Sequence, residues 1–252
     1  MTVSQVAGVP ATSWIADVFG WRYSFGFVVL TGLLALAILT PMLSRIPART
    51  PASVEGETDR PFSLVVYGVL CVTFLVVVSE FIVYSYVSLF ISGTILPGVP
   101  LLSTALFAYG AGAVTGNLAC GILTDKMGPY RVLLASVTAQ VALLVALIAF
   151  GQHGLLTVVI AFLWGNVSYM YLVPIQHRLL GLAGYRTKLV LAMNSSTIYA
   201  GIGTGASIGG WLVEGNGAKG LALASIIIGA AGIALALYFM RDRTSGQLTE
   251  AT

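Results

Sequence analysis

The sequence predicts an all-α, polytopic membrane protein with about eight transmembrane helices. Of its 252 residues, 58% are hydrophobic and only 8% are charged, and the mean hydropathy is +0.95. A soluble domain carries about 25% charged residues. A transmembrane helix needs about 20 residues, so the chain holds at most about ten spans and leaves no room for a sizeable soluble domain.

Apolar runs between breaking residues place the spans. The first run is the weakest, because it contains Gln5, Pro10, Ser13 and Asp17 and has no basic flank before it. We therefore expect the chain to begin inside a helix. The eight expected spans are residues 2–18, 21–43, 62–91, 101–124, 131–150, 155–179, 189–213 and 220–240.

Basic residues set the expected orientation. The loops on one side contain nearly all of them, whereas the other side has only Arg22 and Lys219, and the side richer in Lys and Arg is cytoplasmic. The polar segment 44–61 is then a cytoplasmic linker between two structural halves, 241–252 is a cytoplasmic tail, and both termini are cytoplasmic. The basic side holds Arg45, Arg49, Arg60, Lys126, Arg131, Arg178, Arg186, Lys188, Arg241 and Arg243.

The character of the helices repeats with a period of three. A polar helix (62–91), a glycine-rich helix (101–124) and an aliphatic helix (131–150) are followed by the same three types in the same order. Repeated three-helix units are typical of secondary transporters. We expect polar helices to line a cavity, glycine-rich helices to slide against one another, and aliphatic helices to face lipid.

Glu80 is the one formal charge well inside an expected span. A carboxyl there costs about 2.5–3.5 kcal/mol on insertion scales, so it should face protein or water. It could take up and release a proton during transport, with Thr73 and Tyr84 on the same helix face. The alternative is a structural carboxyl that is hydrogen-bonded to a neighbouring helix, and the two interpretations carry similar weight.

A second polar stripe, formed by Asn166, Tyr169, Met170 and His177, could bind a polar substrate. Interhelical hydrogen bonding, worth about 0.6 kcal/mol per contact, is at least as good an explanation for any one of these residues. The small-residue ridges 112–116 and 201–209 favour close helix packing.

The segment between two cytoplasmic helix ends carries a recognisable pattern. It reads GILTDKMGPYR over residues 121–131 and resembles the GxLxDrxGxrr loop signature of the major facilitator superfamily, in its second-half copy. The resemblance implies a loop that gates the cytoplasmic side through ion pairs and helix dipoles. Tyr130 departs from the usual basic residue, and a simple positive-inside turn is the plainer explanation. The implied gating residues are Gly121, Asp125, Lys126, Gly128 and Arg131.

Further segments resemble the drug:proton antiporter branch of that superfamily, which includes arabinose-type, nucleoside and chloramphenicol exporters. They are GVP at 8–10, GWRYSF at 20–25, WG at 164–165 with VPIQ at 173–176, and NSS at 194–196. The resemblance implies that the spans are helices five to twelve of twelve. It makes 1–43 the end of the N-terminal half, and 62–240 the C-terminal six-helix half. Gly8 and Pro10 would belong to the antiporter motif, and Asn194 to the substrate pathway.

We therefore expect a proton-coupled secondary transporter that exports a small organic molecule, such as a drug, sugar or nucleoside, by alternating access. The alternatives are a non-transporting truncated or scaffold membrane protein, and an importer of the same fold. An enzyme is disfavoured, because no metal-spaced or nucleophile-base cluster is present, and no cofactor, metal or nucleic acid is expected. The expected partners are the substrate, protons, the lipid bilayer, and a missing N-terminal half or another membrane chain. The expected location is the inner membrane of a bacterium.

Overall fold

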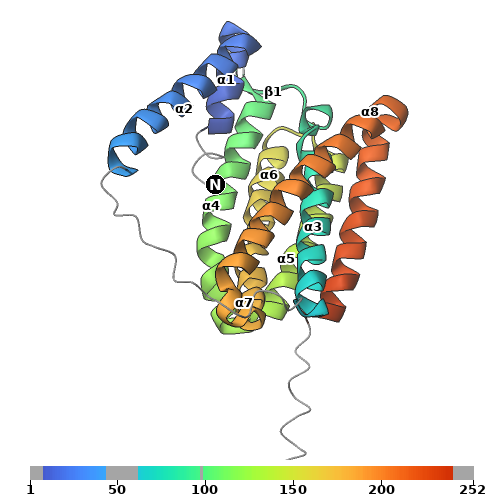
Figure 1. Cartoon of the computed structure of the whole chain (residues 1–252). Coiled ribbons are helices and arrows are strands. Elements are labelled where there is room, and N and C mark those ends of the chain that lie inside the picture. The colour runs from blue at the N-terminus through green and yellow to red at the C-terminus, as the bar shows by residue number, and fades with distance from the viewer. Residues whose placement is uncertain (1–7, 44–61, 97–98, 241–252) are drawn as a thin grey trace, which may run out of the picture.

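The helices of this chain pack side by side in a bundle whose length matches a membrane. The computed structural model describes residues 8–43, 62–96 and 99–240 (Figure 1). In that part of the chain, six helices are long and apolar enough to cross a membrane, and the expected all-α polytopic fold is confirmed. The expected linker 44–61 and tail 241–252 lie outside the described residues.

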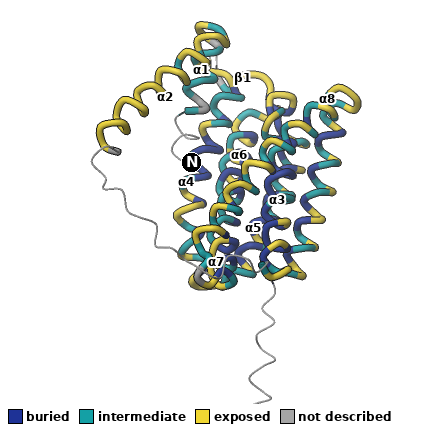
Figure 2. Tube along the Cα trace, in the orientation of Figure 1, coloured by how far each residue is buried: buried dark blue, intermediate teal, exposed yellow. Residues whose placement is uncertain are grey.

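The N-terminal pair lies beside the bundle. Helix α1 (Val9–Phe19) contacts α2 (Trp21–Leu43) and α4 (Leu101–Met127). The Ser24 hydroxyl donates to the Thr12 carbonyl oxygen at 2.7 Å. No described residue of α2 is buried (Figure 2). Its bounds agree with the expected second span.

Helix α3 (Leu64–Tyr84) is the most buried of the membrane-length helices. The expected span 62–91 is wrong beyond Tyr84, where a 3-10 turn (η2, Val87–Leu89) and a short antiparallel hairpin follow. Serines are frequent from residue 85 onwards, and their hydroxyls compete for backbone hydrogen bonds. The hairpin consists of β1 (Thr94–Leu96) and β2 (Val99–Pro100).

Helices α4 (Leu101–Met127) and α5 (Pro129–Phe150) are joined by Gly128 alone. Its φ of 83° lies in the region that only glycine adopts easily, so the chain can reverse within one residue. Both helices are a few residues longer than the expected spans at this end.

The expected span 155–179 is present as one membrane-length segment, Leu155–Ala183, but its helix is interrupted. It is broken into α6 (Leu155–Ser168) and α7 (Leu172–Ala183). Pro174 has no N–H to donate to the carbonyl oxygen of Met170. The thiol of Cys120 in α4 donates to that oxygen instead, at 2.8 Å, which satisfies a backbone group that the membrane could not.

Helix α8 (Thr187–Phe239) contains the last two expected spans, which follow the short turn η3 (Gly184–Arg186). The expected loop between them is reduced to Gly217, whose φ of 59° is again in the glycine region. In Figure 1 the chain rises along the first part of α8 and returns along the second.

The glycine ridges set the helix pairing. A methyl group on Gly112 would lie 2.0 Å from the Phe162 carbonyl oxygen, and one on Gly116 would lie 1.9 Å from that of Asn166. The backbones of α4 and α6 are therefore in direct contact, as expected for small-residue ridges. On α8, Gly205 faces the backbone of α3 in the same way.

The two glycine-rich helices, which we expect to slide against one another, pack mainly on other helices in this structure. The glycine-rich helix α4 packs on α6, which is the polar helix of the other three-helix unit, and glycine-rich α8 packs on polar α3. Each glycine-rich helix thus packs against the polar helix of the other three-helix unit.

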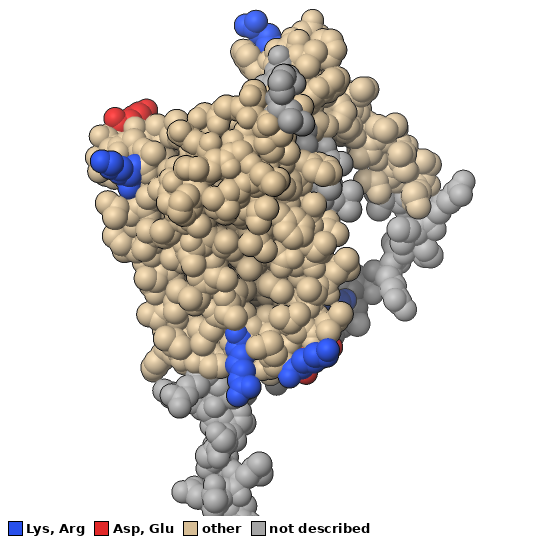
Figure 3. Space-filling model, turned by 180° about the vertical axis from the view of Figure 1, so that it is seen from behind, with Lys and Arg blue, Asp and Glu red and all other residues tan. Residues whose placement is uncertain are grey.

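Charged side chains gather at the two ends of the bundle and leave the middle of the face in Figure 3 without any. Lys126, Arg131, Arg178, Arg186 and Lys188 belong to the end where α4 meets α5 and α7 meets α8. This distribution agrees with the asymmetry in the sequence. That the cationic end is cytoplasmic remains a prediction.

We expect Gly116→Ala to destabilise the bundle and Gly121→Ala to leave it nearly unchanged. The first methyl group would meet the α6 backbone, an overpacking that costs about 1–3 kcal/mol. The second, on the same helix, has no atom within 4 Å. Thermal unfolding of the two variants in detergent measures the difference. Equal unfolding temperatures would disprove the close α4–α6 contact.

Labelling from outside the cell should miss cysteines placed at Arg49, Lys126 and Arg186, because the cationic end is expected to be cytoplasmic. A cysteine at Lys219 should react. The background is Cys71→Ser, which removes the exposed native thiol and leaves buried Cys120 in place. Efficient labelling at Lys126 in intact cells would reverse the assigned orientation.

Candidate functional site

Glu80 is the only charged side chain that is buried among the described residues, with 3% of its surface exposed. It lies on α3 where two hydrophobic clusters of buried residues meet. Val77 belongs to one cluster and Val78 to the other. The carboxyl is therefore inside the helix bundle itself and closed off from solvent. The sequence had predicted this burial from the cost of a charge in lipid.

The partner of Glu80 is Tyr109 in α4, whose hydroxyl donates a hydrogen bond to the carboxyl. The buried hydroxyl of Ser168, at the end of α6, also faces the carboxyl. Three helices therefore meet at one acidic group, and its hydrogen bond to Tyr109 links α3 to α4.

Three aromatic rings form a wall beside the carboxyl. The ring centroids of Tyr84 and Tyr109 are 5.0 Å apart, and those of Tyr109 and Trp164 are 4.8 Å apart. Trp164 is buried, and its Nε1 has no hydrogen-bond partner in the part of the chain that the structure describes. An acidic group beside aromatic faces and a free N–H donor can bind an organic molecule with polar groups, or a proton alone.

The second predicted stripe is not preserved. The break between α6 and α7 separates Asn166 from His177, which is exposed. The Asn166 amide donates to the Thr115 hydroxyl of α4 at 2.9 Å. Tyr169, half-buried at the end of α6, is within electrostatic range of Tyr109 and joins the Glu80 group.

Asn194 is buried at another level of the bundle. Its Oδ1 accepts a hydrogen bond of 3.1 Å from the Thr73 hydroxyl. Thr73 precedes Glu80 by seven residues, which is about 10 Å along a helix. Asn194 is therefore not part of the Glu80 group, and in this conformation it links α8 to α3.

The residues of the predicted gating loop occupy the cationic end. Asp125, Lys126 and Arg131 are exposed, and Gly128 makes the turn between α4 and α5. Gly121 lies one helical turn or more before them with open space around its Cα.

At the N-terminus, Gly8 is the N-cap of α1, and its carbonyl oxygen accepts from the Thr12 hydroxyl at 2.8 Å. Pro10 lies in the first turn of the described helix, where proline is tolerated. The motif is therefore at the start of the described α1.

Tyr109, Trp164 and Ser168 were not singled out as site residues from the sequence. A signal for Tyr109 was present, because it precedes Gly112 and Gly116 by three and seven residues and so shares the face that approaches α6. Trp164 precedes Gly165, whose Cα is against the Tyr109 backbone.

The fold and the site define a multi-pass membrane protein built from two interlocked three-helix units around a buried acidic group. Comparison with known families makes this more specific. Residues 1–181, more than two thirds of the chain, match the model of the Major Facilitator Superfamily, and the chain belongs to this superfamily.

Individual relatives are distant but match nearly the whole chain. A probable sugar efflux transporter of Pasteurella multocida (strain Pm70) is 24% identical over 237 residues, which are 93% of this chain and 58% of that protein. An uncharacterized MFS-type transporter of Bacillus subtilis (strain 168) is 27% identical over 94% of this chain and 60% of its own length. An inner membrane transport protein of Escherichia coli (strain K12) is 26% identical over 96% and 62%. The chain thus spans about three fifths of the length of these curated relatives, and the matches point to a transporter rather than an enzyme.

We expect Thr73 and Asn194 to be energetically coupled, because their hydrogen bond joins two helices in an apolar interior. A double-mutant cycle with Thr73→Val and Asn194→Leu should give a coupling of about 0.6 kcal/mol, and at most about 1.7. Ser207→Ala is the control partner, because Ser207 is exposed and bonds only to the Gly203 carbonyl of its own helix. Additive effects of the first pair, together with lost transport in Asn194→Leu, would instead support a pathway role for Asn194.

Proposed function

We infer that this chain belongs to a proton-coupled secondary transporter that exports small organic molecules by alternating access. The observation that carries the proposal is the buried Glu80 carboxyl, which is bonded to Tyr109 at the meeting point of α3, α4 and α6. The name of one relative, a probable sugar efflux transporter, supports export of a small solute. The aromatic wall suits a sugar, a nucleoside or a drug, and the proposal extends to that class.

The proton would act through the link between α3 and α4. A tyrosine hydroxyl bonds about twice as strongly to a carboxylate as to a neutral acceptor. Proton loss from Glu80 therefore tightens the bond to Tyr109, and proton binding loosens it. Because Glu80 also faces Ser168 in α6, this single event biases the contacts of three helices, which is what a coupling site must do.

The movement would use the helix contacts at which glycine lets one backbone lie directly against another. The glycine faces of α4 and α8 contact backbone directly, and the break between α6 and α7 gives the bundle a point where one segment can tilt. Discontinuous helices near the middle of the membrane are a recurring feature of secondary transporters. Asp125, Lys126 and Arg131 are exposed at the end that would gate access from the cytoplasm. Gly8 and Pro10 are proposed to belong to the antiport motif.

A structural role for Glu80 is the second candidate, because the carboxyl is already buried and hydrogen-bonded. A non-transporting membrane protein is a further alternative, which absence of flux in every variant would support. The direction of substrate flux distinguishes import from export.

We expect Glu80→Gln to fold and insert normally but to lose the dependence of transport on a pH gradient. Glutamine keeps the size and the acceptor for Tyr109 but cannot exchange a proton. The matched control is Glu214→Gln, an exposed carboxyl near the end of the bundle. The measurement is substrate flux in proteoliposomes with and without an imposed pH gradient. The chain as printed is compared with the chain extended by any coding sequence that lies in frame upstream.

Unchanged pH dependence in Glu80→Gln would make Glu80 structural and remove the proposed coupling site. Substrate flux in the same direction as the protons would replace export by import. We expect the chain as printed to transport less than the extended protein, since it spans about three fifths of its relatives. Equal flux from both would show that this chain suffices.

A further inference from the structure

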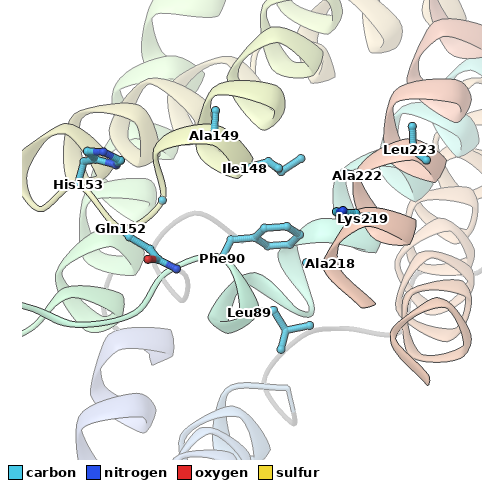
Figure 4. A pocket seen from close by; sticks show the side chains of 11 residues that line it. Leu89, Phe90, Ile148, Ala149, Gln152, His153, Ala218, Lys219, Ala222 and Leu223 are labelled. Atoms are coloured by element: carbon cyan, nitrogen blue, oxygen red, sulfur yellow. The ribbon is translucent and has the colours of Figure 1, made fainter. Parts of the chain in front are cut away.

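A cavity of about 650 Å³ lies at the end of the bundle opposite the cationic end. It is bounded by η2, the last turn of α5 and the start of the second part of α8, directly after Gly217. Figure 4 shows Ile148 and Phe90 on one side of this space and Lys219 and Leu223 on the other, with Gln152 and His153 further along the α5 to α6 connection. The volume is in the range of small-molecule sites.

Lys219 is the one lysine or arginine in its lining, which also includes His153 and contains no acidic residue. In the sequence only Lys219 and Arg22 belong to this side of the membrane. The guanidinium of Arg22 lies 4.9 Å from the ring centroid of Trp21 and so has a partner. Lys219 is exposed and makes no ion pair within residues 8–43, 62–96 and 99–240. Glu214 lines a separate, smaller pocket with Trp211 and Asn216.

The rest of the cavity wall is apolar and open at its rim. Leu89 and Leu223, both in the lining, are 48% and 62% exposed. Next to the cavity, Phe150 is 44% exposed. Large apolar side chains exposed at the end of membrane helices contact lipid rather than water. A ligand of this cavity therefore needs an apolar body for the wall and a negative group for Lys219.

We propose that this cavity binds a phospholipid with an anionic headgroup, and that Lys219 contacts the phosphate. The acyl chain lies along Leu89, Phe90, Ile148 and Leu223, while Gln152 and His153 offer hydrogen-bond donors to the glycerol part of the headgroup. The positive-inside rule disfavours a lysine at this end, and an anionic lipid gives it a partner. The site is separate from Glu80 and does not depend on the proposed transport.

The test uses a photoreactive residue, Leu223→p-benzoylphenylalanine, in the full chain reconstituted into vesicles. The vesicles contain phosphatidylglycerol and phosphatidylcholine in equal amounts and with identical acyl chains. The measurement is the ratio of the two lipid adducts after illumination, by mass spectrometry. The control position is Leu34 in α2, which is 60% exposed and far from any described cavity lining.

At Leu223 we expect phosphatidylglycerol to be enriched about fivefold over its share in the vesicles, as one basic residue near a membrane surface provides. Lys219→Ala should remove this enrichment and Lys219→Arg should restore it. Ala222→Trp, which fills the cavity without changing its charge, should lower the yield of both adducts at Leu223. At Leu34 the adduct ratio should equal the vesicle composition in every variant.

Three outcomes would overturn the proposal. The first is an adduct ratio at Leu223 equal to the vesicle composition. The second is an enrichment that persists in Lys219→Ala. The third is loss of the phosphatidylglycerol adduct when water-soluble glycerol phosphate is added in excess, which would assign the site to a soluble anion instead.

Discussion

Direct backbone contact at glycine is the constraint on which the arrangement of this bundle depends. Lipid tails are as apolar as leucine, so helices in a membrane gain little from burying apolar side chains against one another. Gly116 and Gly205 instead let α4 approach α6 and α8 approach α3. Because each contact joins one three-helix unit to the other, the two units form one interlocked body.

The position of Glu80 follows from these contacts. Gly165 of α6 lies against the Tyr109 backbone, which places the Trp164 and Tyr109 rings together and brings the Tyr109 hydroxyl to the carboxyl. A wider α4–α6 spacing would leave the acid without its donor. Close packing thus accounts for both the stability of the bundle and the placement of its one buried charge among the described residues, so a substitution at Gly116 or Gly165 would disturb both.

The sequence was sufficient for the class and for the burial of Glu80, since these depend on composition and on the cost of charge in lipid. It predicted about eight spans, whereas the described part of the chain has six membrane-length helices, because α8 joins two expected spans and the described α1 has only 11 residues. It also predicted the close packing of the glycine ridges. It did not predict which helices pair, because pairing depends on contacts between residues about 50 positions apart for α4 and α6 and about 120 positions apart for α3 and α8. The break before Pro174 was missed because the freed Met170 carbonyl is satisfied by Cys120, on another helix.

The exchange of partners between the two units has a consequence for synthesis. Val77 in α3 contacts Gly201 in α8, and a ribosome that adds about 5–20 residues per second needs roughly 6–25 s to make the chain between them. Throughout that interval α3 is in the membrane without its main partner. Tyr109 in α4 emerges far sooner and can hold the carboxyl meanwhile. Helix α4 thus gives the Glu80 carboxyl a hydrogen-bond partner during synthesis, until α8 is made and packs against α3.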